Sequence, residues 1–144
     1  MKLIDANVLL YADNEDAQHH DWARSWLEEA LERAETLMVP WISALAYLRI
    51  STHSGIHPAP NSVDAAVGFL QSVLEASNVV TGEPDSRHLE RVRGLLGPIG
   101  QGGNLVNDAH LAALALQFDA TVISYDNDFS RFPGVRWERP MRPE

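Results

Sequence analysis

The sequence predicts an α/β domain with a central, mostly parallel sheet of four to five strands flanked by helices. Short apolar runs alternate with longer amphipathic segments, which is the pattern of βαβ units with right-handed crossovers. The length of 144 residues suits one hydrophobic core, and no linker or internal repeat divides the chain. We therefore expect residues 1–144 to form a single domain.

Short apolar runs bounded by polar or turn residues are the candidate strands. The first leads directly into Asp5, and the second is closed by Pro40, a residue that suits the end of a strand. In chain order the predicted strands are Leu3–Ile4, Leu37–Val39, Asn78–Thr81, Thr121–Ser124 and Val135–Trp137.

Longer segments with apolar residues at helical spacing are the predicted helices. Ser62 and Asp64 are typical residues for the start of one of them. The helices begin with a short one from Val8–Tyr11 and continue with Gln18–Ala34, Ile42–Ser54, Ser62–Ala76, Asp85–Leu96 and Asn104–Phe118.

The spacing within these helices also predicts which side chains face the core. In the second helix they are Trp22, Trp26, Leu27 and Leu31. In the third they are Leu45, Leu48 and Ile50, and in the fourth Val63, Val67, Leu70 and Leu74. In the last helix they are Leu105, Ala109, Ala112 and Leu116.

Composition excludes several classes of protein. The absence of cysteine excludes disulfides, thiolate zinc sites, iron–sulfur clusters and cysteine nucleophiles. Asp5 interrupts any signal-peptide core, and no apolar run approaches the roughly 20 residues that span a bilayer, so we expect a soluble, cytoplasmic protein with no membrane partner. A net charge of −9 is evidence against a nucleic-acid-binding protein that contacts phosphates mainly through Lys and Arg. It permits a nuclease whose positive charge is a bound metal ion.

Four carboxylates are predicted to converge at one edge of the sheet. Asp5 ends the first strand, Asp126 and Asp128 follow the fourth, and Asp108 lies in the first turn of the last helix. The carboxyl ends of parallel strands meet at one edge, and clustered carboxylates need a counter-charge such as Mg²⁺. Taken singly, Asp5 suits a helix cap, Asp108 suits the positive end of a helix dipole, and Asp126 and Asp128 suit an ordinary turn. Only their convergence favours a metal site.

Three blocks of the chain resemble those of a known family. The segments Ile4–Leu10, Asn107–Ala115 and Thr121–Phe129 are similar to the three acidic blocks of PIN domains. Their order and the chain length resemble the VapC toxins of toxin–antitoxin pairs. The resemblance implies a PIN-like three-layer fold and a Mg²⁺- or Mn²⁺-dependent endoribonuclease acting on RNA. It also implies a homodimer that a small VapB-type antitoxin inhibits, in a heterotetramer or a larger complex.

The resemblance also implies roles for single residues. Four carboxylates would be catalytic: Asp5, Asp108, Asp126 and Asp128. Asp5, Asp108 and Asp126 would hold the metal, which would activate a water for in-line attack on a phosphodiester. Asn7 and Ser124 stand where the family has polar residues that orient the carboxylates or the substrate.

One position departs from the family pattern. PIN nucleases generally carry a Glu on the helix predicted here at Ile42–Ser54, yet no Asp or Glu occurs between Glu35 and Asp64. Tyr47 falls roughly where that Glu is expected, and we interpret it as a core side chain. Loss of one carboxylate should weaken or delete a second metal position. The alternative to the nuclease is thus a catalytically weakened module that mainly binds its antitoxin or RNA.

Three arginines are candidate contacts for RNA phosphates. Arg131 and Arg136 belong to a basic C-terminal segment, and Arg49 lies on the third predicted helix. A solvated tail, a contact with an acidic partner or an intramolecular ion pair would explain the same residues.

The remaining histidines and tryptophans have simpler interpretations. His19 and His20 suit a solvated helix start, because no second pair at ligand spacing supports a metal site. His110 points about 200° away from Asp108 around the helix, which favours a packing or surface role. The four Trp residues suggest core or interface anchors.

Two other enzyme classes that gather acids at strand ends are excluded. A receiver-type phosphoacceptor needs a Lys near the fourth or fifth strand, and Lys2 is the only Lys in the chain. A haloacid-dehalogenase-like phosphatase needs Asp-x-Asp after the first strand, where this chain has Asn7 in the second position.

Overall fold

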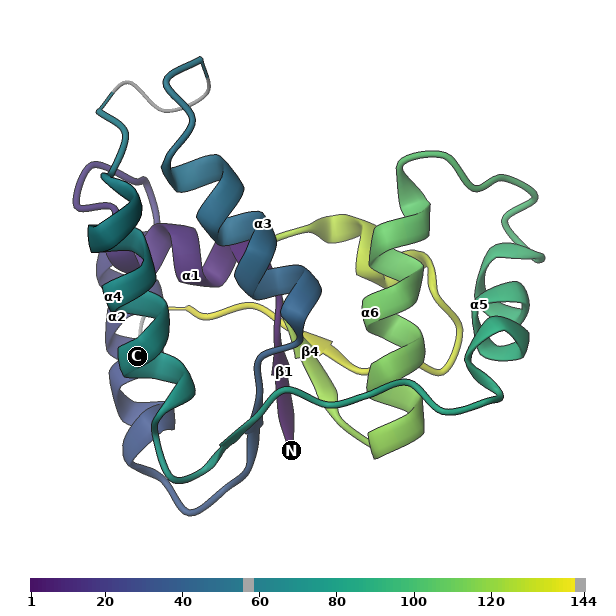
Figure 1. Cartoon of the computed structure of the whole chain (residues 1–144). Coiled ribbons are helices and arrows are strands. Elements are labelled where there is room, and N and C mark those ends of the chain that lie inside the picture. The colour runs from purple at the N-terminus through teal and green to yellow at the C-terminus, as the bar shows by residue number, and fades with distance from the viewer. Residues whose placement is uncertain (56–58, 142–144) are drawn as a thin grey trace.

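The computed structural model describes residues 1–55 and 59–141 and contains a parallel sheet at its centre (Figure 1). Its five strands lie in the order β3-β2-β1-β4-β5, and every pair is parallel. They are β1 (Lys2–Ile4), β2 (Leu37–Met38), β3 (Val79–Val80), β4 (Thr121–Ile123) and β5 (Trp137–Glu138). The predicted fold class is confirmed, with the last strand beginning two residues later than expected.

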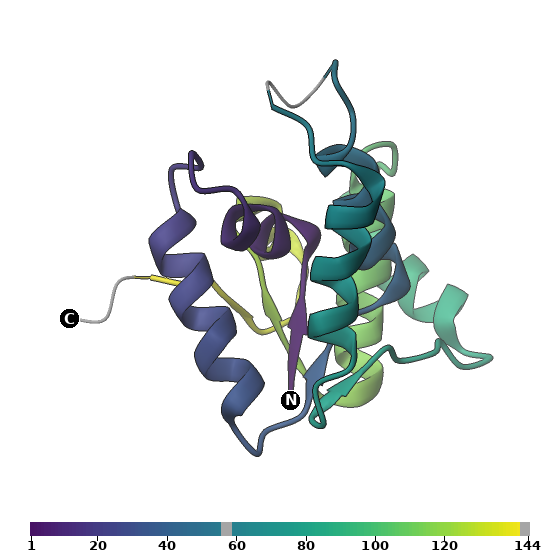
Figure 2. The ribbon, with the colours of Figure 1, turned by 60° about the vertical axis from the view of Figure 1, so that its left-hand side comes forward.

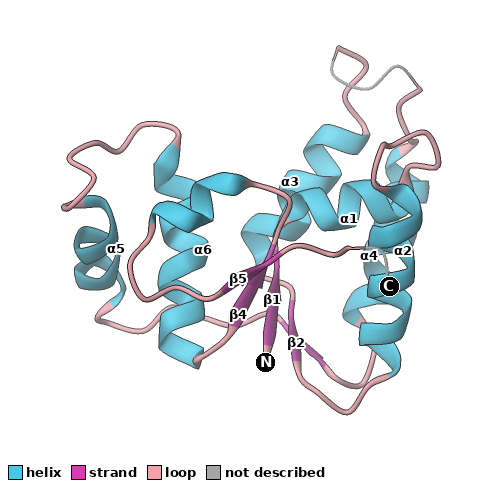
Figure 3. Cartoon of the chain, turned by 180° about the vertical axis from the view of Figure 1, so that it is seen from behind, coloured by secondary structure: helices cyan, strands magenta, loops and turns pink. Residues whose placement is uncertain are grey.

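Helices connect the strands and cover both faces of the sheet. They are α1 (Ala6–Asp13), α2 (His20–Glu32), α3 (Trp41–Ser51), α4 (Val63–Leu74), α5 (His88–Leu96) and α6 (Leu105–Phe118), followed by the 3₁₀ helix η1 (Asn127–Arg131). Figure 3 shows α5 and α6 on one side of the sheet and α1, α2 and α4 on the other, and the core contacts of α3 place it mainly with α1, α2 and α4. In Figure 2 the sheet lies between α2 and α6. Within the described ranges, no helix has the length and apolar character that crossing a membrane requires.

Alternating side chains of the central strands divide the core into two clusters, as the pleat requires. Leu3 and Val122 point into the cluster shared with α5 and α6, whereas Ile4 and Ile123 point toward α1 to α4. The strands are therefore buried on both faces, and the carboxyl ends of β1 and β4 open at one edge between the two helical layers.

The predicted core face of α3 is correct for Leu48, which is partly buried against the core, and wrong for Leu45. Leu45 is 56% exposed, and the buried residues of this helix are Ser43, Ala44, Tyr47 and Ser51. Small side chains let α3 approach its neighbours closely, so the helix turns Ser43 and Ala44 inward beside Tyr47 and leaves Leu45 at the surface.

In each of two other helices, one residue that was predicted to face the core is exposed instead. Val63 at the start of α4 is 62% exposed, while Ala66, Leu70 and Val73 are buried. Leu116 near the end of α6 is 40% exposed, although the rest of its predicted stripe is buried. Val63 lies at the start of α4, whereas Leu116 lies on an outer face of α6, since Leu114, Ala115 and Phe118 on either side of it pack against the core.

Tyr47 is a core residue, as expected. Its ring is fully buried, and its hydroxyl donates a 2.6 Å hydrogen bond to Oδ2 of Asp13. Asn61 Nδ2 donates to the same oxygen at 2.8 Å. Burial, together with the hydrogen bond to the carboxylate, raises the pKa of Tyr47, so the phenol stays protonated.

We expect Tyr47→Phe to lower the free energy of unfolding by about 1–2 kcal/mol, because Asp13 loses a short hydrogen bond in a partly buried setting. Urea unfolding followed by circular dichroism measures the change. Tyr11→Phe is the matched control, because no hydrogen bond of its hydroxyl is found among the described residues. Equal stability of the two variants would contradict the prediction.

Candidate metal centre and active site

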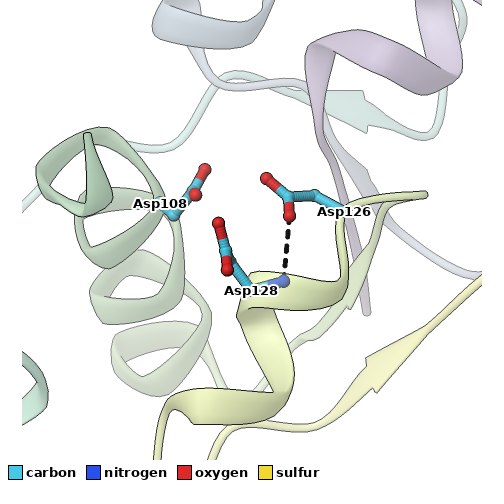
Figure 4. A group of neighbouring side chains, drawn as sticks. All are labelled: Asp108, Asp126 and Asp128. Carbon is cyan, nitrogen blue, oxygen red and sulfur yellow. Dashed lines mark hydrogen bonds between the residues drawn. The ribbon is translucent and has the colours of Figure 1, made fainter. Parts of the chain in front are cut away.

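Carboxylates from three elements meet at the edge where β1 and β4 end. Asp126 follows β4, Asp128 lies in the first turn of η1, and Asp108 projects from the first turn of α6. One oxygen from each lies within 4.8 Å of the others, and Figure 4 shows the three side chains around a common centre. We call these three residues the acidic cluster.

Local backbone structure explains why Asp126 and Asp128 lie together. Asp126 precedes η1, and its Oδ1 accepts a 2.9 Å hydrogen bond from the backbone N–H of Asp128 (Figure 4). This cap folds the chain back directly after β4. Asp108 reaches the same place from the opposite layer, because α6 packs its small residues Ala109, Ala112 and Ala113 into the core.

Asp5 lies beside the cluster in a hydrogen-bonded setting of its own. Its Oδ1 accepts from the N–H of Ala6 at 2.7 Å, so it also caps α1. Its Oδ2 accepts from Ser124 Oγ at 2.7 Å, and Asn7 Nδ2 donates to Ser124 Oγ at 3.1 Å. Asn7 Oδ1 in turn accepts from the N–H of Tyr125. The predicted supporting residues Asn7 and Ser124 therefore tie the end of β1 to the end of β4.

The group of carboxylates differs from the predicted metal ligands in one member. The sequence-based set is Asp5, Asp108 and Asp126, whereas the structure groups Asp128 with the last two. Asp5 and Asp108 nevertheless line one cavity of about 170 Å³. Asp5 thus faces the centre from the β1 side, with both oxygens already engaged by the protein.

Burial and mutual repulsion disfavour the charged form of two carboxylates at this centre. Burial, followed by repulsion from Asp126 and Asp5, raises the pKa of Asp108 to about 7. Burial also raises the pKa of Asp5, against the opposing hydrogen bond from Ser124. Carboxylate oxygens are the donors that hard divalent cations prefer, so the residues present fit such an ion.

Helix α3 contributes an uncharged wall to the same cavity. Ile42, Ser43 and Ala46 line it, and Tyr47 instead points into the core toward Asp13. Ser43 was missed by sequence reasoning. Its hydroxyl is buried, and no hydrogen-bond partner for it exists within the described part of the chain. A lone Ser inside an apolar helical run is the signal that could have found it.

The three candidate arginines lie in different places. Arg131 reaches Asp128 of the acidic cluster at 3.9 Å. Arg49 is exposed one turn beyond Ala46, on the side of α3 that faces the cavity. Arg136 donates to the carbonyl of Asp119 and pairs with its carboxylate at the start of β4, so it lies at the opposite edge of the sheet.

Two histidine predictions have opposite outcomes. His110 packs against α5, where its Nδ1 lies 2.8 Å from Nε2 of His88, which confirms a packing role. His19 is not simply solvated. It is half-buried and stacks on Tyr125 with the ring centroids 4.5 Å apart.

Comparison with known proteins assigns the chain to a family. The model of the PIN domain matches residues 2–135. Ribonuclease VapC37 of Mycobacterium tuberculosis is 44% identical over 140 residues, which is 97% of each chain. Ribonuclease VapC31 of the same species is 35% identical over 140 residues, covering 97% of this chain and 99% of the relative.

Solved structures share the fold at lower identity. M. tuberculosis VapC20, described as a sarcin–ricin loop cleaving toxin, superposes with a TM-score of 0.69 at 16% identity, covering 94% of this chain and 99% of that one. VapBC2 from Rickettsia felis, bound to a DNA fragment from its promoter, gives a TM-score of 0.68 at 22% identity, with 96% and 97% coverage. The chain is therefore a PIN-domain protein that belongs to the VapC ribonuclease family.

Proposed function

We propose that the protein is an endoribonuclease toxin that hydrolyses RNA phosphodiesters with a Mg²⁺ or Mn²⁺ ion held by Asp108, Asp126 and Asp128. The convergence of these three carboxylates within 4.8 Å at the edge of the sheet is the observation that carries the proposal. The ion would activate a water and offset charge on the phosphoryl oxygens.

The chain's own residues have distinct tasks in this proposal. Asp126 and Asp128 are preorganised by the cap of η1, so little rearrangement is needed when an ion binds. Asp5 is held by hydrogen bonds from Ser124 and from the N–H of Ala6. It would therefore orient the substrate groups that enter the cavity between it and Asp108. In this arrangement Asp5 completes the catalytic set from the β1 side, next to the three carboxylates that hold the ion.

Phosphate groups of the RNA are proposed to contact Arg131 and Arg49. Arg131 is half-exposed beside Asp128, and Arg49 lies on the cavity side of α3. Arg136 does not belong to this surface, because its guanidinium is occupied by Asp119 at the far edge.

An antitoxin partner and self-association complete the proposal. Solved structures with this fold include VapBC2 and the FitAcB complex from Neisseria gonorrhoeae, which gives a TM-score of 0.68 at 23% identity. Trp41 and Leu45 of α3 are 50% and 56% exposed, which suits a contact surface. We propose a homodimer that binds a VapB-type antitoxin as a heterotetramer or a larger complex.

Cleavage of a total small-RNA pool by purified, antitoxin-free protein tests this function. Discrete fragments are expected with Mg²⁺ or Mn²⁺ and none with EDTA. An absence of cleavage in all three conditions would favour the alternative of a weakened binding module, for which the uncharged Ser43 and Ala46 on the cavity wall would be the physical cause.

Metal binding is expected to stabilise the fold. Mn²⁺ at 100 times its dissociation constant should raise the melting temperature by about 5–10 °C, because an ion that binds only the folded state contributes about 2.7 kcal/mol. Differential scanning calorimetry with and without Mn²⁺ measures this shift. Asp126→Asn should remove most of it, and an equal shift in that variant would place the ion elsewhere.

A further inference from the structure

A hollow with aromatic walls lies next to the acidic cluster and has no role in the function proposed so far. It encloses about 470 Å³ between α2 and the segment that follows β5. Its lining residues are His19, Trp22, Asn127, Trp137, Arg139 and Met141. Asn127 stands between Asp126 and Asp128 in the chain, so one wall of the hollow belongs to the loop that carries the cluster.

Stacked rings hold the aromatic walls in place. The ring of Tyr125, one residue before Asp126, stacks on His19 with an angle of 4° between the planes. His19 in turn stacks on Trp22 with the centroids 5.8 Å apart. Across the hollow, Trp137 is fixed by a 2.8 Å hydrogen bond from its Nε1 to the carbonyl of Ser124. Trp137 is therefore anchored to the backbone segment that leads into the cluster, and Trp22 is connected to it through the rings of His19 and Tyr125.

A cation without a carboxylate partner borders this hollow. The guanidinium of Arg139 lies 5.7 Å from the ring centre of Trp137 and donates to the carbonyl of Tyr125 and to Asn127 Oδ1. In residues 1–55 and 59–141, no carboxylate lies within 4 Å of it, whereas Arg131 and Arg136 are both in ion pairs. In a chain of net charge −9, this is an attractive place for a phosphate.

We propose that the hollow binds one unpaired RNA base, stacked against Trp22 with Trp137 on the opposite wall, and that Arg139 contacts the adjoining phosphate. Aromatic faces with a neighbouring Arg are the usual means by which proteins hold single-stranded bases. Because Asn127 joins the hollow to the cluster, the bound base belongs to a nucleotide beside the phosphate that is cleaved. The inference rests on the proposed ribonuclease function and adds to it a binding site for one base of the substrate.

Tryptophan indole N–H signals test the proposal directly, since the chain has only four Trp residues. The ¹⁵N-labelled protein is titrated with octa-adenylate RNA in a buffer that contains Ca²⁺. The length of the RNA is measured after the titration, so that any cleavage during the experiment is detected. A ribose-phosphate octamer without bases is the control ligand. The signals of Trp22 and Trp137 should move with octa-adenylate and stay in place with the abasic octamer. The signal of Trp26, which packs against the core from the same helix, should not move with either.

Matched variants separate stacking from general effects on the fold. Trp22→Leu should weaken octa-adenylate binding about tenfold, Trp22→Phe should retain most of the affinity, and Trp26→Leu should leave it unchanged. Equal binding of the abasic octamer, or an unchanged affinity in Trp22→Leu, would overturn the inference. So would movement of these signals by an antitoxin peptide but not by RNA.

The outcomes also distinguish this inference from the ribonuclease function. RNA cleavage without movement of the Trp22 and Trp137 signals would contradict the base-binding hollow and leave the ribonuclease proposal intact. Movement of those signals without metal-dependent cleavage would support the hollow and contradict the nuclease.

Discussion

Asp108→Asn and Asp126→Asn are each expected to reduce RNA cleavage by about 100-fold or more while the protein stays folded. Each variant removes one of three carboxylates around the common centre, and even residues outside the direct ligands of a metal usually contribute 10–100-fold. The fold should tolerate the change, because replacing Asp108 also removes its repulsion from Asp126 and Asp5. Cleavage rates in Mg²⁺ and melting temperatures in EDTA measure the two effects.

Asp64→Asn is the matched control for these variants. Asp64 is also an acid in the first turn of a helix, but it is exposed on α4 and lies outside the cluster. Its replacement should leave cleavage unchanged. Normal cleavage by Asp108→Asn or Asp126→Asn would exclude the cluster as the catalytic centre.

Metal affinity is expected to fall about tenfold for each pH unit below 7, because a proton on Asp108 competes with the ion. The pKa of Asp108 in the metal-free protein is about 7, so the carboxyl is largely protonated at pH 6 and ionised at pH 8. Calorimetric titration with Mn²⁺ at pH 5.5, 6.5 and 7.5 measures the effect. The same affinity at all three pH values would contradict the assignment of Asp108 as a ligand.

The same carboxyl predicts how the stability of the metal-free protein depends on pH. Between pH 4 and pH 7, the folded state keeps a proton on Asp108 that the unfolded chain, with a pKa near 3.8, has released. The contribution of Asp108 to stability is therefore full below pH 4 and declines as the pH rises toward 7. Asp108→Asn should flatten this part of the curve, and Asp64→Asn should not.

The acidic cluster could be predicted because it depends on topology. Parallel strands place Asp126 at the same edge as Asp5, and the small residues of α6 bring Asp108 there from the other layer. The membership of Asp128 in the innermost group depends on the cap at Asp126, which is a detail of local backbone geometry. Spacing alone does not distinguish that arrangement from an ordinary turn.

The rotation of a helix about its axis and the ion-pair partners of surface arginines were harder to predict. The rotation of α3 follows from how closely Ser43 and Ala44 let it pack, and a hydrophobicity pattern assigns the core to Leu45 instead. Arg136 is separated from the cluster because β5 runs parallel to β4 and Arg136 directly precedes it, next to Asp119 before the start of β4. In each case the answer depends on three-dimensional neighbours that a single sequence does not name.

The hydrogen bond between Ser124 and Asp5 joins positions that lie 119 residues apart along the chain. Asp108, Asp126 and Asp128 also come late in the sequence, so a growing polypeptide on the ribosome holds the first carboxylate long before its partners exist. Folding that proceeds from the N-terminus during synthesis therefore cannot complete the acidic cluster until η1 has been made. The nuclease activity that we propose for the acidic cluster accordingly requires synthesis of the chain at least as far as Asp128.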